Sequence, residues 1–591
     1  MRRFRRVVRL FLRYRGTLLA GGAFLLLSNA LVLVIPVLVQ RGIDAIDPAK
    51  GASDPEAVPR APEEVLRLLA FTAIAVVALS ALRGLFLFLQ RLLLIGVSRR
   101  VEADLKADLF AHLTTLSLPT FDRTRTGDLI SRATGDVEAV RMLLGPGVMY
   151  LASAALLIPG AFAVMVARSP LLTLLLVLPL GALALAMRRL APALHATSRS
   201  VQDTLSEISH RAQENFAAVR VVKGFAREAW EIARFRAVTD RYRGHQVGFG
   251  DVRAKTHALF GGAQDAAALL IFIVGGLGVL QGDFTYGGMV LFLDLVRKLF
   301  WPLLAVGWIV GAYERAAAAM DRIEEIFRTE PLVRDAPDAQ AHAVEGKIEV
   351  RDLTFAYDGA PALRGVSFDA PAGSVLGLVG PLASGKSTLL HLLGRLYPVP
   401  DESILVDGID VNRIALADLR GAMAYVPQDS FLFSDTIREN VAFGFEERPP
   451  EEAIARAVEA AGLAPDLAGF PDGLDTRIGE RGITLSGGQR QRVAIARALL
   501  CDARVLLLDD ALSSVDAETE SRILESLRAA ARGRTVVLVA HCLSTVAHAD
   551  RIAVFAEGRL AEAGTHEELI ARGGWYARTW NLQRLEAEID R

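Results

Sequence analysis

The sequence predicts two domains of different fold class: an all-α membrane domain with six spanning helices, then an α/β domain with a phosphate-binding loop. Three observations support this. Hydrophobic residues make up 52% of the 591, and the longest apolar runs lie before about residue 315. Beyond residue 345, short apolar runs that predict strands alternate with helical patterns; examples are Lys347–Val350, Val375–Val379, Arg504–Asp509 and Thr535–Ala540. One of these runs leads into a glycine-rich string, Gly380–Thr388. We expect the membrane domain at 1–330, a linker at 331–345 and the α/β domain at 346–591.

Six segments each hold the roughly 20 apolar residues that a helix needs to cross a bilayer. They lie at 17–40, 65–94, 140–167, 170–190, 256–281 and 287–311. Before them, Met1–Arg15 alternates arginine with apolar residues, which predicts an amphipathic helix on an anionic membrane surface rather than a cleavable signal peptide. By the positive-inside rule this end is cytoplasmic, and an even number of spans places both termini there.

The connections expected on the cytoplasmic side are long and charged, at roughly 99–136 and 188–255, whereas the outer ones are shorter. Two stretches within the long connections, Leu118–Gly127 and Val219–Phe225, are candidates for short helices at the end of each hairpin. A solvated helical hairpin would explain their charges equally well. The candidate contact residues in these stretches are Phe121, Asp122, Val222 and Lys223.

Polar side chains are costly inside a bilayer, so those within the spans are candidates for lining a cavity. The fifth span holds Gln264 and Asp265, and the sixth holds Asp294 and Arg297. Asp294 also precedes Arg297 and Lys298 by three and four residues, so these charges can neutralise one another on one helix face. Local pairing and contact with a bound solute both remain open.

The string that follows the apolar run Val375–Val379 has the pattern G-x-x-x-x-G-K-[ST]. In such a loop, backbone N–H groups and the positive end of the next helix face the phosphates of a nucleotide. Lys386 would add a point charge, and Ser387 would add a magnesium ligand. The expected nucleotide-binding residues are Gly380, Pro381, Leu382, Ala383, Ser384, Gly385, Lys386, Ser387 and Thr388.

Two further strings complete this pattern. The apolar run Val505–Asp509 ends in two carboxylates, and we expect Asp509 to be a magnesium ligand. An arginine-rich helical pattern opens with Leu485, Ser486, Gly487, Gly488 and Gln489. Together, the three strings resemble the ATP-binding cassette (ABC) family. The six spans, with their short outer loops, resemble the membrane domain of ABC exporters, so the resemblance covers the whole chain. It implies that Leu118–Gly127 and Val219–Phe225 are the short coupling helices of that family.

The resemblance implies ATP and Mg²⁺ as cofactors, and two cassettes that enclose ATP between them. It also implies roles for individual residues at the chain's own site: Tyr357 stacks on adenine, Gln428 senses the γ-phosphate and holds the metal, and His541 is the switch histidine. Ser387 and Asp509 would be metal ligands. Toward the partner, Leu485–Gln489 would contact the partner's ATP, Asp516 would lie in a loop touching the opposite site, and Glu480 and Arg481 would lie in an exporter-specific coupling segment. Two alternatives stay open. Tyr357 could be a packed core aromatic, and His541 a satisfied polar residue at a strand end.

Three positions depart from the family pattern. Asp510 stands where the family usually has the glutamate that positions the attacking water. Aspartate withdraws the carboxylate by about 1 Å, and misplacement on that scale can cost on the order of 100-fold in rate. Ala383 replaces a usual glycine, at a cost of about 1 kcal/mol if its φ is positive. Cys542 stands where arginine is usual, and nothing in the sequence explains that change.

Asp510 is thus a weakened catalytic base, whereas Leu485–Gln489, the signature motif of the family, is intact. This combination is the pattern expected of one half of a heterodimer. The expected function is a subunit of an ATP-driven exporter of hydrophobic or amphipathic compounds in a bacterial cell membrane. Its partners would be membrane lipids and a second ABC half, with a homodimer less favoured. A lipid or glycolipid flippase, an importer on the same fold and a non-transporting ATP sensor are alternatives. The net charge of −1 gives no support for a nucleic-acid partner, and the two cysteines do not suggest a disulfide framework.

Overall fold

The computed structural model describes residues 3–46, 62–479, 485–512, 517–530 and 533–589. The chain divides into two compact units. The first, helical unit comprises Met1–His112 and Gly127–Arg328, and the second, α/β unit comprises Leu113–Thr126 and Thr329–Arg591. The short segment around residue 120 therefore groups with the α/β unit, although it lies within the region expected to form the membrane domain.

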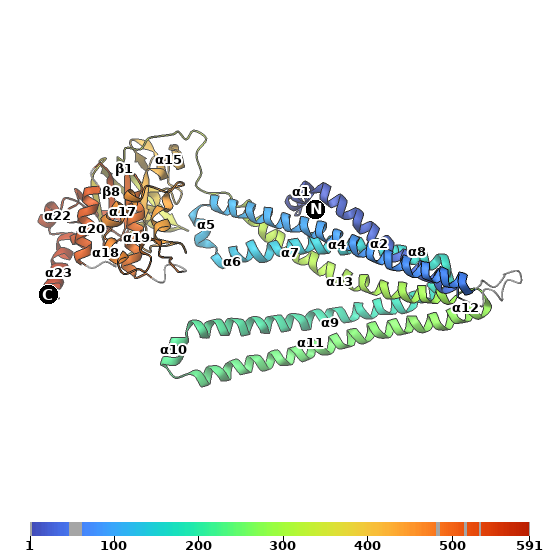
Figure 1. The fold of residues 1–591 in the computed structure, drawn as a ribbon. Helices are drawn as coiled ribbons and strands as arrows, with labels where there is room; N and C mark the ends of the chain where they lie inside the picture. Colours follow the sequence, from blue (N-terminus) through green and yellow to red (C-terminus); the bar gives the residue numbers. More distant parts are fainter. Residues whose placement is uncertain (1–2, 47–61, 480–484, 513–516, 531–532, 590–591) are drawn as a thin grey trace. The chain divides into compact units, whose positions relative to one another are not determined.

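Helices, several of them more than 40 residues long, form the first unit (Figure 1). They are α1 (Arg5–Arg13), α2 (Arg15–Asp44), α4 (Pro62–Thr115), α6 (Thr126–Ser131), α7 (Val137–Met142), α8 (Val148–Arg168), α9 (Pro170–Ala217), α10 (Val219–Gly224), α11 (Glu228–Leu270), α12 (Gly276–Gln281) and α13 (Tyr286–Arg328). Single π-helical turns join α6 to α7, α7 to α8 and α11 to α12. In Figure 1, α9 and α11 run side by side in opposite directions, with α10 at their turn.

Within the described residues, five helical stretches are long and apolar enough to cross a membrane. They are Arg15–Asp44, Glu63–Thr115, Thr126–Arg168, Pro170–Ala217 and Glu228–Gln281, and they contain the first five predicted spans. The sixth predicted span lies in α13, a helix of 43 residues that includes the charged residues Asp294, Arg297 and Lys298. The predicted helical membrane domain is confirmed.

The membrane helices bury one face and expose apolar side chains on the other. Buried residues of α8, α9, α11 and α13, such as Leu176 and Phe292, share one hydrophobic cluster. Phe71 and Ile74 on α4 are about two-thirds exposed. A helix satisfies its own backbone hydrogen bonds, so apolar side chains of this kind can face lipid.

The α/β unit contains two sheets. The larger has the order β10-β9-β3-β8-β7-β6 and the smaller the order β2-β1-β4-β5. In the larger sheet β9, β3, β8, β7 and β6 are parallel, and β10 is antiparallel to β9. The strands are β1 (Ile348–Tyr357), β2 (Ala360–Ala370), β3 (Val375–Val379), β4 (Ile404–Val406), β5 (Ile409–Asp410), β6 (Met423–Val426), β7 (Val505–Asp509), β8 (Thr535–Val539), β9 (Arg551–Ala556) and β10 (Arg559–Gly564).

Helices flank these sheets. They are α5 (Leu118–Arg123), α14 (Lys386–Leu393), α15 (Leu416–Gly421), α16 (Ile437–Val441), α17 (Glu451–Ala460), α18 (Ala464–Leu467), α19 (Gly487–Leu500), α20 (Ala517–Ala530), α21 (Leu543–Val546), α22 (His566–Arg572) and α23 (Trp575–Ile589). The parallel sheet is buried on both faces. Leu506 and Leu508 belong to one hydrophobic cluster, and Val505 and Leu507 to the other, because successive strand side chains point to opposite faces.

The parallel order brings four candidate segments to one edge of the sheet, because the carboxyl ends of parallel strands coincide there. The glycine-rich loop follows β3, and the two aspartates stand at the end of β7. Gln428 follows β6, and His541 follows β8. The segment 331–345, expected as a linker, contacts this unit: the Gln340 N–H donates to Arg413 O at 2.8 Å.

Candidate nucleotide-binding site

The loop between β3 and α14 has a backbone that only certain residues can adopt. Gly380 and Gly385 have φ of +145° and +101°. A Cβ on Gly380 would lie 2.1 Å from Phe555 O, and one on Gly385 would lie 2.7 Å from Ala362 O. Both positions therefore require glycine. Ala383, where the family usually has glycine, also has a positive φ, +58°.

The side chain of Lys386 folds over this loop. Its Nζ donates to Gly380 O and Pro381 O, both at 2.9 Å, and to Ser384 Oγ at 3.2 Å. All three acceptors are neutral. Burial lowers the pKa of Lys386, and the carboxylates of Asp509 and Asp510 act in the opposite direction. The ammonium is thus held inside the phosphate loop, at the start of α14, where an anion would gain both a charge and a helix N-terminus.

Ser387 and Asp509 form the candidate metal site. Ser387 Oγ donates to Asp509 Oδ1 at 2.9 Å, and Asp509 is 3% exposed. Burial is the main cause that raises the pKa of Asp509, and the hydrogen bond from Ser387 opposes it. A hydroxyl beside a carboxylate supplies the hard oxygen ligands that Mg²⁺ prefers, so the donor set fits this ion.

Asp510 directly follows Asp509 of the candidate metal site, and Gln428 and His541 lie near Asp510. Gln428 Nε2 donates to Asp510 Oδ2 at 3.5 Å. Asp510 is buried, and its φ of +48° is left-handed, a region where aspartate occurs more often than most residues. Asp510 and His541 line one cavity of about 230 Å³, together with Cys542. The structure therefore places the three predicted catalytic side chains at one edge of the sheet.

Tyr357 ends β1 and is half-buried. Its ring meets those of Phe355 and Tyr397 edge to face, with centroids 4.9 and 5.1 Å away. Burial is the main cause that raises the pKa of its hydroxyl. Part of the Tyr357 ring is therefore packed against other aromatic side chains, as the core-packing alternative expects. Stacking of the exposed part of the ring on adenine stays a prediction.

The signature string forms the start of α19. Ser486 Oγ accepts from the Gln489 N–H at 3.2 Å, and Gln489 Oε1 accepts from the Ser486 N–H at 2.9 Å, which is a capping box. Gln489 Nε2 also donates to Asp466 at 3.0 Å. Leu485 is buried, which fixes the approach to the helix. Gly487 and Gly488 therefore stand in the first turn, at the positive end of α19.

The two predicted coupling stretches both form short helices, α5 and α10. Asp122 on α5 accepts a hydrogen bond from the Tyr397 hydroxyl, and Leu118 packs against the core of the α/β unit. Phe121 is 38% exposed. On α10, Val222 is half-buried and Lys223 is exposed. Three further predicted residues, Glu480, Arg481 and Asp516, lie outside the described residues.

In the membrane unit, the four residues predicted to line a cavity lie in different surroundings. Gln264 lines a cavity of about 350 Å³ with Phe260 and Phe300, while Asp265 is exposed and does not line it. Asp294 Oδ2 accepts from Lys298 Nζ at 2.5 Å, so the local ion pair is present. Arg297 is exposed.

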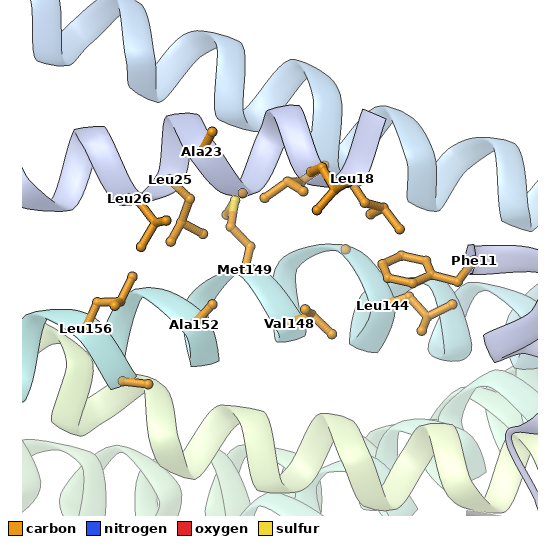
Figure 2. A pocket seen from close by; sticks show the side chains of 15 residues that line it. Phe11, Leu18, Ala23, Leu25, Leu26, Leu144, Val148, Met149, Ala152 and Leu156 are labelled. Carbon is orange, nitrogen blue, oxygen red and sulfur yellow. The ribbon is translucent and has the colours of Figure 1, made fainter. Parts of the chain in front are cut away.

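A larger cavity of about 670 Å³ has an almost entirely apolar lining. Figure 2 shows Leu18 and Leu25 of α2 facing Met149 and Leu156 of α8 across it. No sequence pattern predicts this cavity, because apolar residues are expected on every face of a membrane helix. Other residues that the sequence did not single out are Tyr425, which donates to Asp509, His391, which contacts the Tyr425 hydroxyl, and Tyr397, whose ring packs against His391.

Comparisons with known proteins agree with these features. The model of the ABC transporter transmembrane region matches residues 18–303, and the ABC transporter model matches residues 363–513. The multidrug resistance-like ATP-binding protein MdlA of Escherichia coli is 35% identical over 85% of this chain and 85% of its own length. The chain belongs to the ABC transporter family.

Two further relatives place this ABC transporter among exporters. The ATP-dependent lipid A-core flippase of Pseudomonas fluorescens is 35% identical over 91% of this chain and 90% of its own length. A solved bacterial Atm1-family ABC exporter with ATP bound matches with a TM-score of 0.74, at 30% identity, over 96% of this chain and 98% of that one. The chain is therefore a multi-pass membrane protein of exporter fold, whose cassette is an ATPase coupled to transport.

Proposed function

We propose that this chain is one subunit of a heterodimeric exporter of hydrophobic or amphipathic compounds, whose own ATP site turns over slowly. The observation that carries the proposal is Asp510 beside an intact signature, Leu485–Gln489. Asp510 is one methylene shorter than the glutamate usual at this position. The chain would lend its signature to a glutamate-bearing site on a different partner, while its own phosphate loop holds Mg-ATP.

The geometry supports these different roles for the signature and for the chain's own ATP site. The capping box between Ser486 and Gln489 orders the signature, so that it can contact the partner's nucleotide. Asp510 has a left-handed backbone, and its carboxylate accepts a hydrogen bond from the Gln428 amide at 3.5 Å. A carboxylate about 1 Å short of its water can cost on the order of 100-fold in rate. Ser387, Gln428 and Asp509 are the proposed ligands of Mg²⁺, directly or through water.

The transported compounds would enter from the membrane or the cytoplasm. The apolar cavity of about 670 Å³ suits an apolar molecule, and relatives carry both multidrug and lipid flippase names. A lipid or glycolipid flippase is therefore the second candidate. We place the protein in a bacterial cell membrane with both termini in the cytoplasm, following the arginines of α1 and the positive-inside rule.

The experiment that tests the slow site compares this chain's base with its signature. The purified chain alone should hydrolyse ATP well below about one molecule per second. With a co-purified partner, Gly487→Asp should stop turnover, because its carboxylate faces the partner's ATP, whereas Asp510→Ala should leave most of it. Asp510→Glu should raise turnover at this chain's own site. Equal loss with Asp510→Ala and Gly487→Asp would show two equivalent sites and refute the proposal.

Transport in proteoliposomes separates the two substrate classes. A drug exporter should move fluorescent dyes, and a flippase should move labelled lipids between leaflets. The matched control combines Lys386→Ala in this chain with the same change at the corresponding lysine of the partner. It should abolish transport of both dyes and lipids.

A further inference from the structure

The candidate metal carboxylate, Asp509, is held by two hydroxyls. Ser387 Oγ donates to Oδ1 at 2.9 Å, and the Tyr425 hydroxyl donates to Oδ2 at 3.4 Å. Each carboxylate oxygen thus has its own donor. Asp509 cannot rotate about its Cβ–Cγ bond without losing one of these hydrogen bonds.

His391 is the next residue behind Tyr425. His391 Nε2 lies 3.1 Å from the Tyr425 hydroxyl oxygen. When the Tyr425 hydroxyl donates its hydrogen to Asp509, the neutral imidazole has to donate from Nε2, and Nδ1 then carries no hydrogen. Nδ1 is buried and has no hydrogen-bond partner among the described residues. A hydroxyl that accepts a hydrogen bond becomes a better donor, so His391 strengthens the bond from Tyr425 to Asp509.

An aromatic contact extends this arrangement toward α5. The rings of His391 and Tyr397 lie 5.8 Å apart between centroids, and the Tyr397 hydroxyl donates to Asp122 of α5. Tyr397 also meets Tyr357 edge to face at 5.1 Å. The same cluster of rings therefore contacts the candidate metal carboxylate at one end and α5 at the other.

Apolar rings would fill this space equally well. Instead the chain places an imidazole and two phenol groups here, with Tyr397 buried and His391 and Tyr425 half-buried, and polar groups cost free energy in the interior unless they are hydrogen-bonded. The three hydrogen bonds that they make lead from Asp509 to His391 and from Tyr397 to Asp122. Only the step between His391 and Tyr397 is ring packing.

We propose that Tyr425 and His391 are positioning residues for Asp509, and that Tyr397 joins them to Asp122, so that metal binding at Asp509 and the seating of α5 depend on each other. This inference rests on the proposed role of Asp509 in holding Mg²⁺. Residues behind a metal ligand fix its orientation, and their loss typically costs 10–100-fold in metal affinity.

The test measures ATP binding to the full-length chain in lipid nanodiscs, once with Mg²⁺ and once with EDTA. Tyr425→Phe should reduce the gain in ATP affinity that Mg²⁺ provides by about 10-fold or more, and His391→Phe by a smaller factor, with the affinity in EDTA unchanged. The matched control is Tyr576→Phe, which also removes a tyrosine hydroxyl paired with a histidine, at 2.8 Å from His566. This control should leave the magnesium gain intact.

The results separate the possible failures. No magnesium gain in the unaltered chain would refute the metal role of Asp509 itself. If Mg²⁺ raises the ATP affinity of Tyr425→Phe as much as that of the unaltered chain, the positioning role is overturned. An equal loss of ATP affinity with Mg²⁺ and with EDTA would also overturn it, because such a loss indicates only damage to the fold.

A double-mutant cycle tests the link to α5. Asp122→Asn alone should lower the magnesium gain by at least about threefold, and combining it with Tyr425→Phe should cost less than the product of the two single effects. Strictly multiplicative effects, or no effect of Asp122→Asn, would overturn the link. If Asp122→Asn does not fold, Tyr397→Phe removes the same hydrogen bond and takes its place in the cycle.

Discussion

Ser387 Oγ donates to Asp509 Oδ1 at 2.9 Å, although 122 residues separate them in the sequence. The contact joins the first turn of α14 to the end of β7. Ser387→Ala should remove one oxygen ligand of the metal and lower the apparent affinity for Mg²⁺, in ATP binding, by about 10-fold or more. Ser374→Ala is the control, because its exposed hydroxyl bonds only a local carbonyl at 2.6 Å. A Mg²⁺ titration that gives the same midpoint for both variants would contradict the assignment.

Lys386 gives the second prediction. Its ammonium is 5% exposed and is the cation of the phosphate loop. Lys386→Ala should weaken ATP binding at this chain's own site by about 10- to 150-fold, since a charge-assisted hydrogen bond contributes about 1.5–3 kcal/mol. The measurement is equilibrium binding of a fluorescent ATP analogue. Lys347→Ala is the control, because Lys347 pairs with Glu349 at the surface at 2.5 Å and should leave binding unchanged.

Ala383 gives the third prediction, through its φ of +58°. Ala383→Gly should relieve about 1–2 kcal/mol of left-handed strain. Glycine also widens the unfolded ensemble at a cost of about 0.4–1 kcal/mol, so the net gain in unfolding free energy should be below about 1.5 kcal/mol. Ala468→Gly is the matched control: this alanine is also exposed but has a φ of −64°, so it should only lose stability. Urea unfolding of the full chain measures both, and the same sign for the two changes would count against strain at Ala383.

The two cysteines give the fourth prediction. Cys542 is exposed and lines the cavity that contains Asp510 and His541. Burial raises the pKa of the Cys501 thiol, with Arg497 and Arg534 opposing it. Only the thiolate reacts, and a raised pKa means a smaller thiolate fraction at any pH below it. Iodoacetamide at pH 7.5 should therefore modify Cys542 roughly 10-fold faster.

Two observations check this assignment. Cys542→Ser should remove the fast phase of modification, and the slow phase from Cys501 should speed up as the pH rises toward its raised pKa. Mg-ATP should slow the reaction of Cys542, because the cavity adjoins the candidate base. A fast phase that survives in Cys542→Ser would show that Cys501 is the accessible thiol.

The sequence predicted the strands of the parallel sheet closely, and those of the smaller sheet less well. The predicted run Val375–Val379 coincides with β3, because a strand buried on both faces is continuously apolar. The predicted run Lys347–Val350 covers only the start of β1, which continues to Tyr357. Beyond Val350 the strand carries exposed polar residues and irregular pairing with β2, so the apolar pattern stops before the strand does.

The same contrast holds for the candidate site. Pairing of Asp294 with Lys298 was one of the two alternatives that the sequence left open, because an i,i+4 spacing brings both onto one helix face, and the pair is present. The contact between His391 and Tyr425 joins residues 34 apart that lie on a helix and a strand. No periodicity encodes such a contact, and it depends on how α14 packs against the sheet. The left-handed backbone of Asp510 likewise has no signature in sequence.

The fifth prediction concerns Asp294 itself. Its carboxylate lies 2.5 Å from Lys298 Nζ, and Lys298 also donates to Val32 O at 3.3 Å. Asp294→Asn should leave this half-buried ammonium with the carbonyl alone and destabilise the membrane unit by about 1–3 kcal/mol. Neutralising both residues, in Asp294→Asn with Lys298→Met, should recover part of that loss, because no uncompensated charge remains.

An exposed pair provides the control for this last prediction. Asp251 and Lys255 have the same i,i+4 spacing and lie 2.6 Å apart, with both side chains more than half exposed. Asp251→Asn should therefore change stability by less than about 0.5 kcal/mol. ATP binding should be unaffected in all of these variants. If Asp294→Asn instead keeps full thermal stability and alters which compounds are transported, Asp294 contacts the transported compound, because a residue that only neutralises its neighbour would not change selectivity.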